Sequence, residues 1–320
     1  ALSLGRRYTR WGKTAQYIPE LAAKDPNRLG IALCELDGTL TGAGDWTETF
    51  SIQSISKVMA LILAIEQNGM EYVFEKVGME PTGDAFNSMV RLDQLTNNKP
   101  FNPMINAGAI AVASCIRGRD LDARKTVCLD FARRLTGNSE LGYDQRVFCS
   151  ERETGYRNRA IINLMKANGI IDGDVEPHLE LYFFLCSICA SCKDLAYFAA
   201  MLANNGQDPK SGRQVVPLPV LKLVRSLMVT CGMYDYSGEF AATVGMPAKS
   251  GVGGGIIAAP ILKCGLAVYG PALDAKGNSV GGLKMLEFVS ETLSLNMFWL
   301  SPHNHDENKG RSCYKCFTSL

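Results

Sequence analysis

Two stretches near the ends of the chain alternate between apolar and polar positions in the way that β-strands do. In residues 28–44, Leu29, Ile31 and Leu33 alternate with small or polar neighbours, and Asp37-Gly38 is a typical hairpin-turn pair. Near the other end, residues 255–260 and 263–269 are apolar runs of strand length separated by a short turn. The pattern therefore predicts a β-hairpin early in the chain and two strands late in it.

Between these strands the apolar positions recur with helical spacing or lie in helix-rich composition. The predicted helices span residues 58–67, 103–117, 124–136, 158–168, 179–192 and 193–205. A last helix is predicted over residues 279–296, where leucines and a valine recur every three or four residues. Most of the middle of the chain is therefore expected to be helical.

Short strands on either side of a long helical middle predict an α+β fold. We expect an antiparallel sheet flanked by helices, built from residues 1–57 and 194–300 as one discontinuous domain. Residues 58–193 would form an inserted helical domain. Residues 301–320 are polar and lack periodicity, so we expect a flexible tail.

Composition narrows the function classes. Lys and Arg total 33 against 32 for Asp and Glu, so no net field favours nucleic acid or an anionic membrane. The chain has 11 cysteines, an odd number without the spacing of a disulfide scaffold. It has no apolar run of membrane-spanning length. These two observations predict a cytoplasmic protein. It has only three histidines, His178, His303 and His305, so a serine nucleophile would need a different base.

A serine and a lysine with catalytic spacing precede the first long apolar helix. Ser54 and Lys57 form a Ser-x-x-Lys motif, and side chains at positions i and i+3 of a helix lie roughly 5–6 Å apart at Cβ. Burial and the helix N-terminus both disfavour a lysine cation, so a neutral Lys57 amine could take the proton of Ser54. Because the tetrapeptide is short, the alternative is that Ser54 is a helix cap and Lys57 a solvated residue.

A second element of the same chemistry lies near the C-terminal strands. Lys249-Ser250-Gly251 precedes a predicted strand, and in Ser-x-x-Lys acyl enzymes a triplet of this kind lies on the sheet edge that faces the nucleophile. The glycine-rich run 251–255 would let a substrate oxygen approach backbone N–H groups, although a plain glycine turn is the alternative.

Together with these motifs, segments across nearly the whole body of the chain resemble the serine-dependent glutaminases, in their compact bacterial form. That family has the β-lactamase and penicillin-binding transpeptidase fold. The segments that carry the resemblance are residues 12–19, 50–57, 102–109, 150–153, 157–158, 182–187, 231–235 and 247–252.

The resemblance implies hydrolysis of the L-glutamine side-chain amide to L-glutamate and ammonia through a γ-glutamyl ester. It implies that Ser54 is the nucleophile and Lys57 its base, and that the N–H groups of Ser54 and Val252 bind the oxyanion. Tyr234 would relay a proton to the leaving ammonia and later activate water. We expect Lys57 or Lys249 to lower the pKa of Tyr234 for this role.

The resemblance also implies a pocket for a zwitterionic amino acid. Glu151 would pair with the α-ammonium group, while Tyr17, Asn106, Asn158 and Tyr182 would supply neutral hydrogen bonds. Lys249, Ser250 and Gly251 would support the site.

No cofactor or metal is expected. Cys313 and Cys316 have a metal-binding spacing, but the accompanying His303 and His305 fit a zinc finger poorly. His178 is expected to be a local polar residue. The family likeness implies a homodimer or homotetramer. The remaining alternatives are a penicillin-recognising serine hydrolase of the same fold and a non-catalytic binding protein of that fold.

Overall fold

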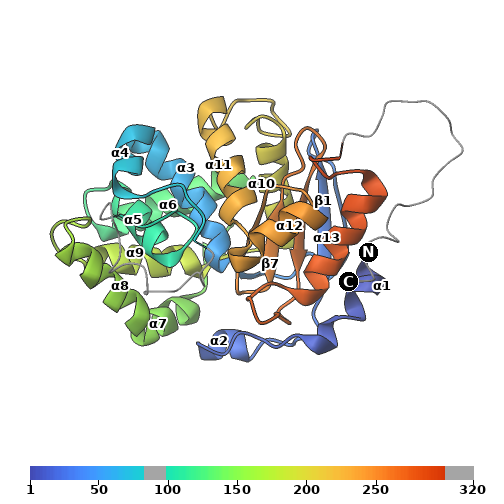
Figure 1. The fold of residues 1–320 in the computed structure, drawn as a ribbon, viewed down its shortest axis with the longest axis horizontal. Coiled ribbons are helices and arrows are strands. Elements are labelled where there is room, and N and C mark those ends of the chain that lie inside the picture. The colour runs from blue at the N-terminus through green and yellow to red at the C-terminus, as the bar shows by residue number, and fades with distance from the viewer. Residues whose placement is uncertain (83–98, 300–320) are drawn as a thin grey trace, which may run out of the picture.

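A five-stranded antiparallel sheet forms one side of the protein (Figure 1). The structure is a computed structural model that describes residues 1–82 and 99–299. The strand order is β2-β1-β8-β7-β6. The strands are β1 (Gly30–Glu35), β2 (Leu40–Gly44), β6 (Ala248–Ser250), β7 (Gly255–Ala258) and β8 (Cys264–Tyr269). The predicted hairpin and both late strands are therefore confirmed.

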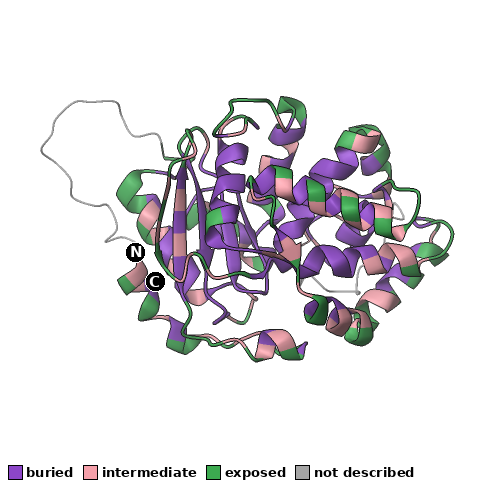
Figure 2. Cartoon of the chain, turned by 180° about the vertical axis from the view of Figure 1, so that it is seen from behind, coloured by how far each residue is buried: buried purple, intermediate pink, exposed green. Residues whose placement is uncertain are grey.

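Each face of the sheet is covered by a helix, as the alternation of side chains requires. Ala32 and Cys34 of β1 belong to the core on the side of α10 (Cys192–Ala203), whereas Ile31 and Leu33 pack into the core on the side of α13 (Val280–Leu293). Figure 2 shows α10 buried along nearly its whole length. The N-terminal helix α1 (Leu2–Arg6) packs on α13, so the two ends of the described chain meet on this face.

The other side of the protein is helical (Figure 1). Its helices are α3 (Ser56–Asn68), α4 (Met70–Lys76), α5 (Asn106–Ser114), α6 (Leu121–Thr136), α7 (Gln145–Thr154), α8 (Tyr156–Ala167) and α9 (Glu176–Ser187). Helix α3 is the centre of this group and contacts α4, α5, α6, α9 and α11 (Leu218–Cys231). Every residue of α3 from Ser56 to Ile65 is buried, which explains why its sequence is apolar all round.

A second sheet, of three very short strands, joins the two sides. Its order is β3 (Phe50–Ser51), β5 (Ile188–Ala190) and β4 (Gly142–Tyr143). The predicted helix over 179–192 is wrong beyond Ser187, because residues 188–190 pair with β3 and β4. The next helix starts afresh at Cys192, where Ser191 and Asp194 form a capping box.

Other helix boundaries differ for similar local reasons. Helix α5 starts at Asn106, three residues after the predicted 103, because the Asn102 side-chain oxygen accepts the N–H groups of Met104 and Ile105. The elements that remain are η1 (Thr9–Trp11), α2 (Pro19–Ala22), η2 (Gln53–Ile55), η3 (Tyr234–Tyr236) and α12 (Ser237–Thr243). The expected tail over 301–320 lies outside the described residues. Within residues 1–82 and 99–299, no helix has both the length and the apolar character needed to cross a bilayer.

Candidate active site

Ser54 and Lys57 lie where the short sheet leads into the central helix. The chain leaves β3, makes the single 3₁₀ turn Gln53–Ile55 and continues into α3, of which Lys57 is the second residue. Ser54 therefore precedes the α-helix, and Lys57 lies on it, one residue before the predicted start of the helix at 58. Both side chains are buried. The helical path still brings Lys57 one turn after Ser54.

The Lys57 amine is held by two oxygen acceptors. It donates to the Met104 carbonyl at 3.1 Å and to the Asn106 side-chain oxygen at 2.8 Å. Asn106 begins α5 and its side-chain nitrogen donates to Asn158 at 3.1 Å. Burial lowers the pKa of Lys57 to about 8, against smaller opposing effects of Cys186 and Glu151. At neutral pH a minor fraction of Lys57 is therefore the uncharged amine, and this fraction grows as the pH rises toward 8.

Glu151 is a buried carboxylate on α7, held by residues from two other segments. The Tyr17 hydroxyl donates to Glu151 at 2.9 Å, and the Gln53 side chain forms a further hydrogen bond with it. Burial raises the pKa of Glu151 to about 7, and these hydrogen bonds only partly offset that rise. A buried carboxylate of this kind gains most when a cation binds beside it.

Tyr182 and Cys186 lie one turn apart on α9, and both side chains face the active site. Both side chains are buried and they interact through a hydrogen bond. Burial raises the pKa of Tyr182 well above its usual range and that of Cys186 to about 12, so both remain protonated at neutral pH. The Cys186 thiol lies near both the Lys57 amine and the Glu151 carboxylate, because each of them shifts its pKa.

Tyr234 belongs to η3, and its hydroxyl lies close to the Ser54 turn and to the segment 250–252. The hydroxyl lies close to the side chains of Ser54 and Ser250 and to the backbone of Val252, and each of these groups lowers its pKa. Lys249, on the edge strand β6, is completely buried. Its amine donates to the Ser250 carbonyl at 2.6 Å and lies 4.5 Å from the centre of the Tyr234 ring.

The expectation that a lysine lowers the pKa of Tyr234 is wrong. Burial raises the Tyr234 pKa, and neither lysine is among its main causes. Lys249 cannot supply a fixed positive charge, because burial and then Lys57 hold its own pKa well below the usual value. The Tyr234 phenol beside Ser54 therefore stays protonated at neutral pH.

The glycines after Ser250 allow the sheet edge to press against the turn that carries Ser54. A Cβ atom at Gly251 would lie 2.5 Å from the Ile52 carbonyl oxygen, and one at Gly253 would lie 2.2 Å from that of Ser51. Side chains at these two positions would push the turn away from the sheet edge. The glycine-rich run therefore allows the sheet edge to pack closely against the turn. This packing role is separate from the exposure of its N–H groups to a substrate.

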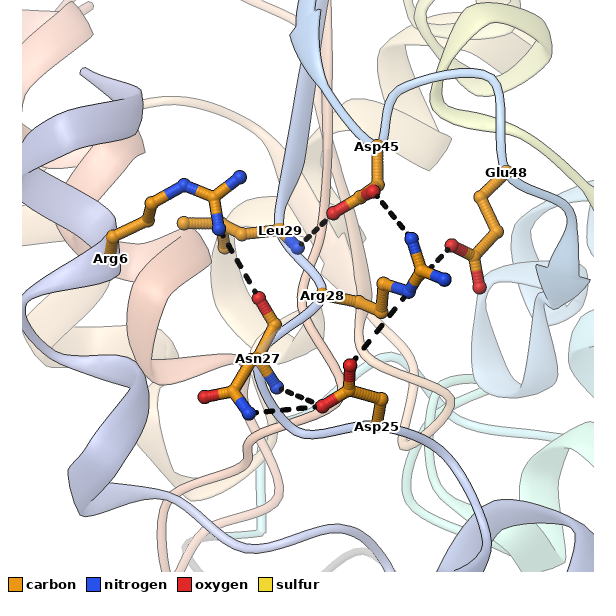
Figure 3. Close-up of polar contacts among 7 residues, drawn as sticks. All are labelled: Arg6, Asp25, Asn27, Arg28, Leu29, Asp45 and Glu48. Atoms are coloured by element: carbon orange, nitrogen blue, oxygen red, sulfur yellow. Dashed lines mark hydrogen bonds and ion pairs between the residues drawn. The ribbon is translucent and has the colours of Figure 1, made fainter.

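The segment that brings Tyr17 into the site is fixed at its far end by ion pairs. Figure 3 shows Arg28 between Asp45 at 2.9 Å, Glu48 at 3.3 Å and Asp25 at 4.0 Å. Asp45 also accepts the Leu29 N–H at 2.9 Å, so the cluster fixes the start of the hairpin. Half-exposed ion pairs contribute little stability, and their role here is to set where the segment leaves the sheet.

The sequence predictions for the site are geometrically coherent. The structure brings together all the candidates, namely Tyr17, Ser54, Lys57, Asn106, Glu151, Asn158, Tyr182, Tyr234, Lys249, Ser250, Gly251 and Val252. Sequence reasoning missed Gln53 and Cys186, although both lie inside segments that resembled the family.

Of the three histidines, only His178 lies among the described residues. His178 lies on α9 and its Nδ1 is 3.2 Å from a guanidinium nitrogen of buried Arg124, which fits a structural role. Burial and Arg124 lower the pKa of His178. His303, His305, Cys313 and Cys316 lie outside the described residues. Among the residues that are described, no group of His, Cys, Asp and Glu side chains is arranged to hold a metal.

Comparison with family models and known proteins shows what the chain is similar to. A family model described as glutaminase matches residues 12–298. A glutaminase of Clostridium botulinum (strain Loch Maree / Type A3) is 52% identical over 293 residues, which cover 92% of this chain and 96% of that protein. A glutaminase of Clostridium tetani is similar to the same degree over the same shares of the two chains.

Solved structures agree with the sequence relatives. The probable glutaminase ybaS has a TM-score of 0.88 and 35% identity over 93% of this chain and 96% of its own. A probable glutaminase from Bacillus subtilis, complexed with 6-diazo-5-oxo-L-norleucine, has a TM-score of 0.85 and 38% identity over 93% of this chain and 94% of its own. The α+β architecture with an antiparallel sheet is thus that of bacterial glutaminases.

Proposed function

The chain belongs to the glutaminase family, and on that premise we propose that Ser54 is the nucleophile with which it hydrolyses L-glutamine to L-glutamate and ammonia. The 6-diazo-5-oxo-L-norleucine bound to the Bacillus subtilis relative is a glutamine analogue, which supports the same substrate here. The steps below follow from the geometry around Ser54.

In the first step, the Ser54 oxygen attacks the side-chain amide carbon as its proton passes to the Lys57 amine. A neutral amine has two N–H donors and one lone pair. The Met104 carbonyl and the Asn106 side chain accept both donors, so the lone pair is directed to the remaining side of the nitrogen. The lowered pKa keeps this lone pair available near neutral pH.

The negative charge that develops on the amide oxygen needs donors that are already in place. The N–H groups of Ser54 and Val252 fill this role, each worth about 3–4 kcal/mol in comparable acyl enzymes. The Val252 backbone lies beside the Tyr234 hydroxyl, which supports its assignment to this wall of the site. Lys249, Ser250 and Gly251 support this wall of the site through the contacts described above.

The carbon–nitrogen bond then breaks and a γ-glutamyl ester forms on Ser54. Tyr234 passes its proton to the nitrogen, which leaves as ammonia, and takes up the proton that Lys57 received from Ser54, so the phenol stays neutral. Its place beside Ser54 supports this role. In the second half, a water molecule attacks the ester and its proton passes through Tyr234 to Lys57 in the same way. Lys57 returns a proton to Ser54 as the ester bond breaks, and glutamate is released.

The α-amino-acid end of the substrate binds on the other side of Ser54. Glu151 pairs with the α-ammonium group, and Tyr17, Asn106, Asn158 and Tyr182 provide neutral hydrogen bonds. The raised pKa of Glu151 supports this assignment, because an ammonium group would return the carboxylate to its charged form.

The observation that carries the proposal is the buried Lys57 amine, held by two acceptors one turn after Ser54. The experiment is ammonia release from glutamine by the wild type, Ser54→Ala and Lys57→Ala. We expect both variants to lose activity, and activity that survives both substitutions would overturn the mechanism. Equal activity on asparagine would overturn the pocket assignment, and acylation of Ser54 by a labelled penicillin would favour the penicillin-recognising alternative.

We also propose that the chain divides into a sheet domain and an inserted helical domain, with the boundaries at residues 57/58 and 193/194. We further propose that it assembles as a homodimer or homotetramer and that it is located in the cytoplasm. All the cysteines among the described residues are free thiols, which supports a reducing compartment. Light scattering on the purified protein tests the oligomeric state, and a monomer would contradict it.

A further inference from the structure

Gln53, the residue directly before Ser54, has a backbone conformation that its side chain does not favour. Its φ is +47°, in the left-handed region that glycine adopts readily. For other residues this conformation is strained. Five non-glycine residues of the described chain have positive φ, and two of them, Gln53 and Tyr234, belong to the active site.

A glycine at position 53 would avoid the strain, so the glutamine side chain has to contribute something that glycine lacks. Its oxygen accepts the Tyr17 hydroxyl at 3.0 Å, and its side chain also hydrogen-bonds with Glu151. Gln53 is 2% exposed and Glu151 is buried, whereas Tyr17 is 48% exposed, so the Gln53 end of these bonds is shielded from water and the Tyr17 end is not. The side chain thus connects the turn before Ser54 to the residues of the ammonium pocket.

The backbone around Gln53 is held from several directions. The Ser56 hydroxyl donates to the Gln53 carbonyl at 2.7 Å, and the Ile52 N–H donates to the Ile188 carbonyl at 2.8 Å. On the sheet side, Gly251 and Gly253 lie directly against the preceding carbonyl groups. A small rotation at Gln53 would therefore move Ser54 relative to fixed surroundings.

We propose that Gln53 is a positioning residue, whose side-chain bonds to Tyr17 and Glu151 hold the left-handed turn that aims Ser54 at the substrate. The inference rests on the proposed role of Ser54. In this arrangement, the residues that bind the ammonium group also anchor the nucleophile, so Gln53 acts on kcat through Ser54 as well as on KM through the pocket.

The test compares Gln53→Ala with Gln53→Gly. Both variants lose the side-chain bonds, so KM should rise equally in the two. Alanine keeps the strain at positive φ without the bonds that hold it, and the turn relaxes, whereas glycine can adopt the turn without strain. We expect kcat of Gln53→Gly to exceed that of Gln53→Ala by about tenfold, which corresponds to about 1.4 kcal/mol.

Matched controls come from Leu262, which is exposed, lies in a loop between two strands and has a φ of +56°. Leu262→Gly should be more stable to heat than Leu262→Ala, with the same kcat. This pair separates strain relief in general from an effect on Ser54. Gln53→Asn is a second variant, because asparagine tolerates positive φ better than alanine does, and its kcat should exceed that of Gln53→Ala.

Equal kcat values for Gln53→Ala and Gln53→Gly, or a higher value for alanine, would overturn the proposal. If Gln53→Ala does not fold, a kcat of Gln53→Gly more than about a hundredfold below the wild type would overturn it instead. Activity in Ser54→Ala would contradict the proposed function itself. That failure is detected with the Ser54 variant, so it can be told apart from a failure of the Gln53 proposal.

Discussion

The Lys57 amine and the Asn106 side-chain oxygen are joined by a hydrogen bond of 2.8 Å between two buried side chains. An amide oxygen is a neutral acceptor, so it orients the amine without stabilising its cation as a carboxylate would. Asn106 therefore allows Lys57 to be held in place and still act as a base. In this view Asn106 serves the catalytic lysine as well as the substrate.

Replacing Asn106 with aspartate should disable Lys57 at neutral pH. A carboxylate at this distance should raise the Lys57 pKa by about one to three pH units. Fewer molecules then have the neutral amine, so kcat at pH 7.5 should fall at least about tenfold, and the rising part of the pH profile should move to higher pH. Steady-state kinetics at several pH values measure this. The control is Asn163→Asp at an exposed position of α8, and an unchanged profile in Asn106→Asp would contradict the role of Asn106.

The activity of the wild type should depend on pH through two groups. Lys57 must be neutral to accept a proton, and its pKa is about 8, so catalysis falls as the pH drops below that value. Glu151 must be ionised to bind ammonium, and its pKa is about 7, so substrate binding weakens below that value. The logarithm of kcat/KM should therefore rise with a slope of about two well below pH 7, and of about one between the two pKa values. A flat profile across this range would contradict both assignments.

Glu151→Gln should weaken substrate binding without unfolding the protein. Glutamine keeps the shape and the hydrogen bond from Tyr17 but loses the charge that faces the ammonium group. Hydrogen bonds to a charged group contribute about 1.5–3 kcal/mol, so KM for glutamine should rise roughly 10- to 150-fold. Glu153→Gln is the matched control, because Glu153 is exposed on the same helix.

The same pair of variants also tests selectivity. The wild type should prefer glutamine strongly over an analogue that lacks the α-amino group, and Glu151→Gln should lose most of that preference. If Glu151→Gln and Glu153→Gln discriminate equally well, Glu151 does not recognise the ammonium group.

Tyr234→Phe should reduce kcat with little change in KM. The substitution keeps the buried ring beside Lys249 and removes the hydroxyl that lies beside Ser54. Loss of a proton relay costs about 10²- to 10⁴-fold in rate. Tyr236→Phe, two residues away and packed against Phe240, is the control and should retain activity. A Tyr234→Phe enzyme with normal kcat would assign the relay to another group.

Much of the fold can be predicted from local patterns. The alternation at Ile31 and Leu33 identifies β1 because each of its faces meets a different core, and the apolar character of α3 follows from its burial on all sides. The strand at residues 188–190 could not be found in this way. Its three residues continue an apolar helical pattern, and only pairing with residues distant in sequence makes them a strand.

The site was predictable to the extent that its chemistry lies in side-chain type and spacing. Ser54, Lys57 and the Lys249-Ser250-Gly251 triplet have such patterns. The positive φ of Gln53 has no local signature, because it depends on Tyr17, Glu151 and the glycine-rich loop. The raised pKa of Tyr234 has no local signature either, because it comes mainly from burial of the phenol, which depends on the whole fold around it.

The central claim is that Ser54 carries the γ-glutamyl group during turnover, and acid-quenched mass spectrometry tests it most directly. The wild type and Tyr234→Phe would be mixed with glutamine, quenched within one turnover, and digested to locate the modified peptide. We expect the added mass of one glutamyl residue on Ser54, with more of it in Tyr234→Phe if deacylation is slowed. A glutamyl group on another residue such as Cys186, or turnover with no covalent adduct in either protein, would contradict the account.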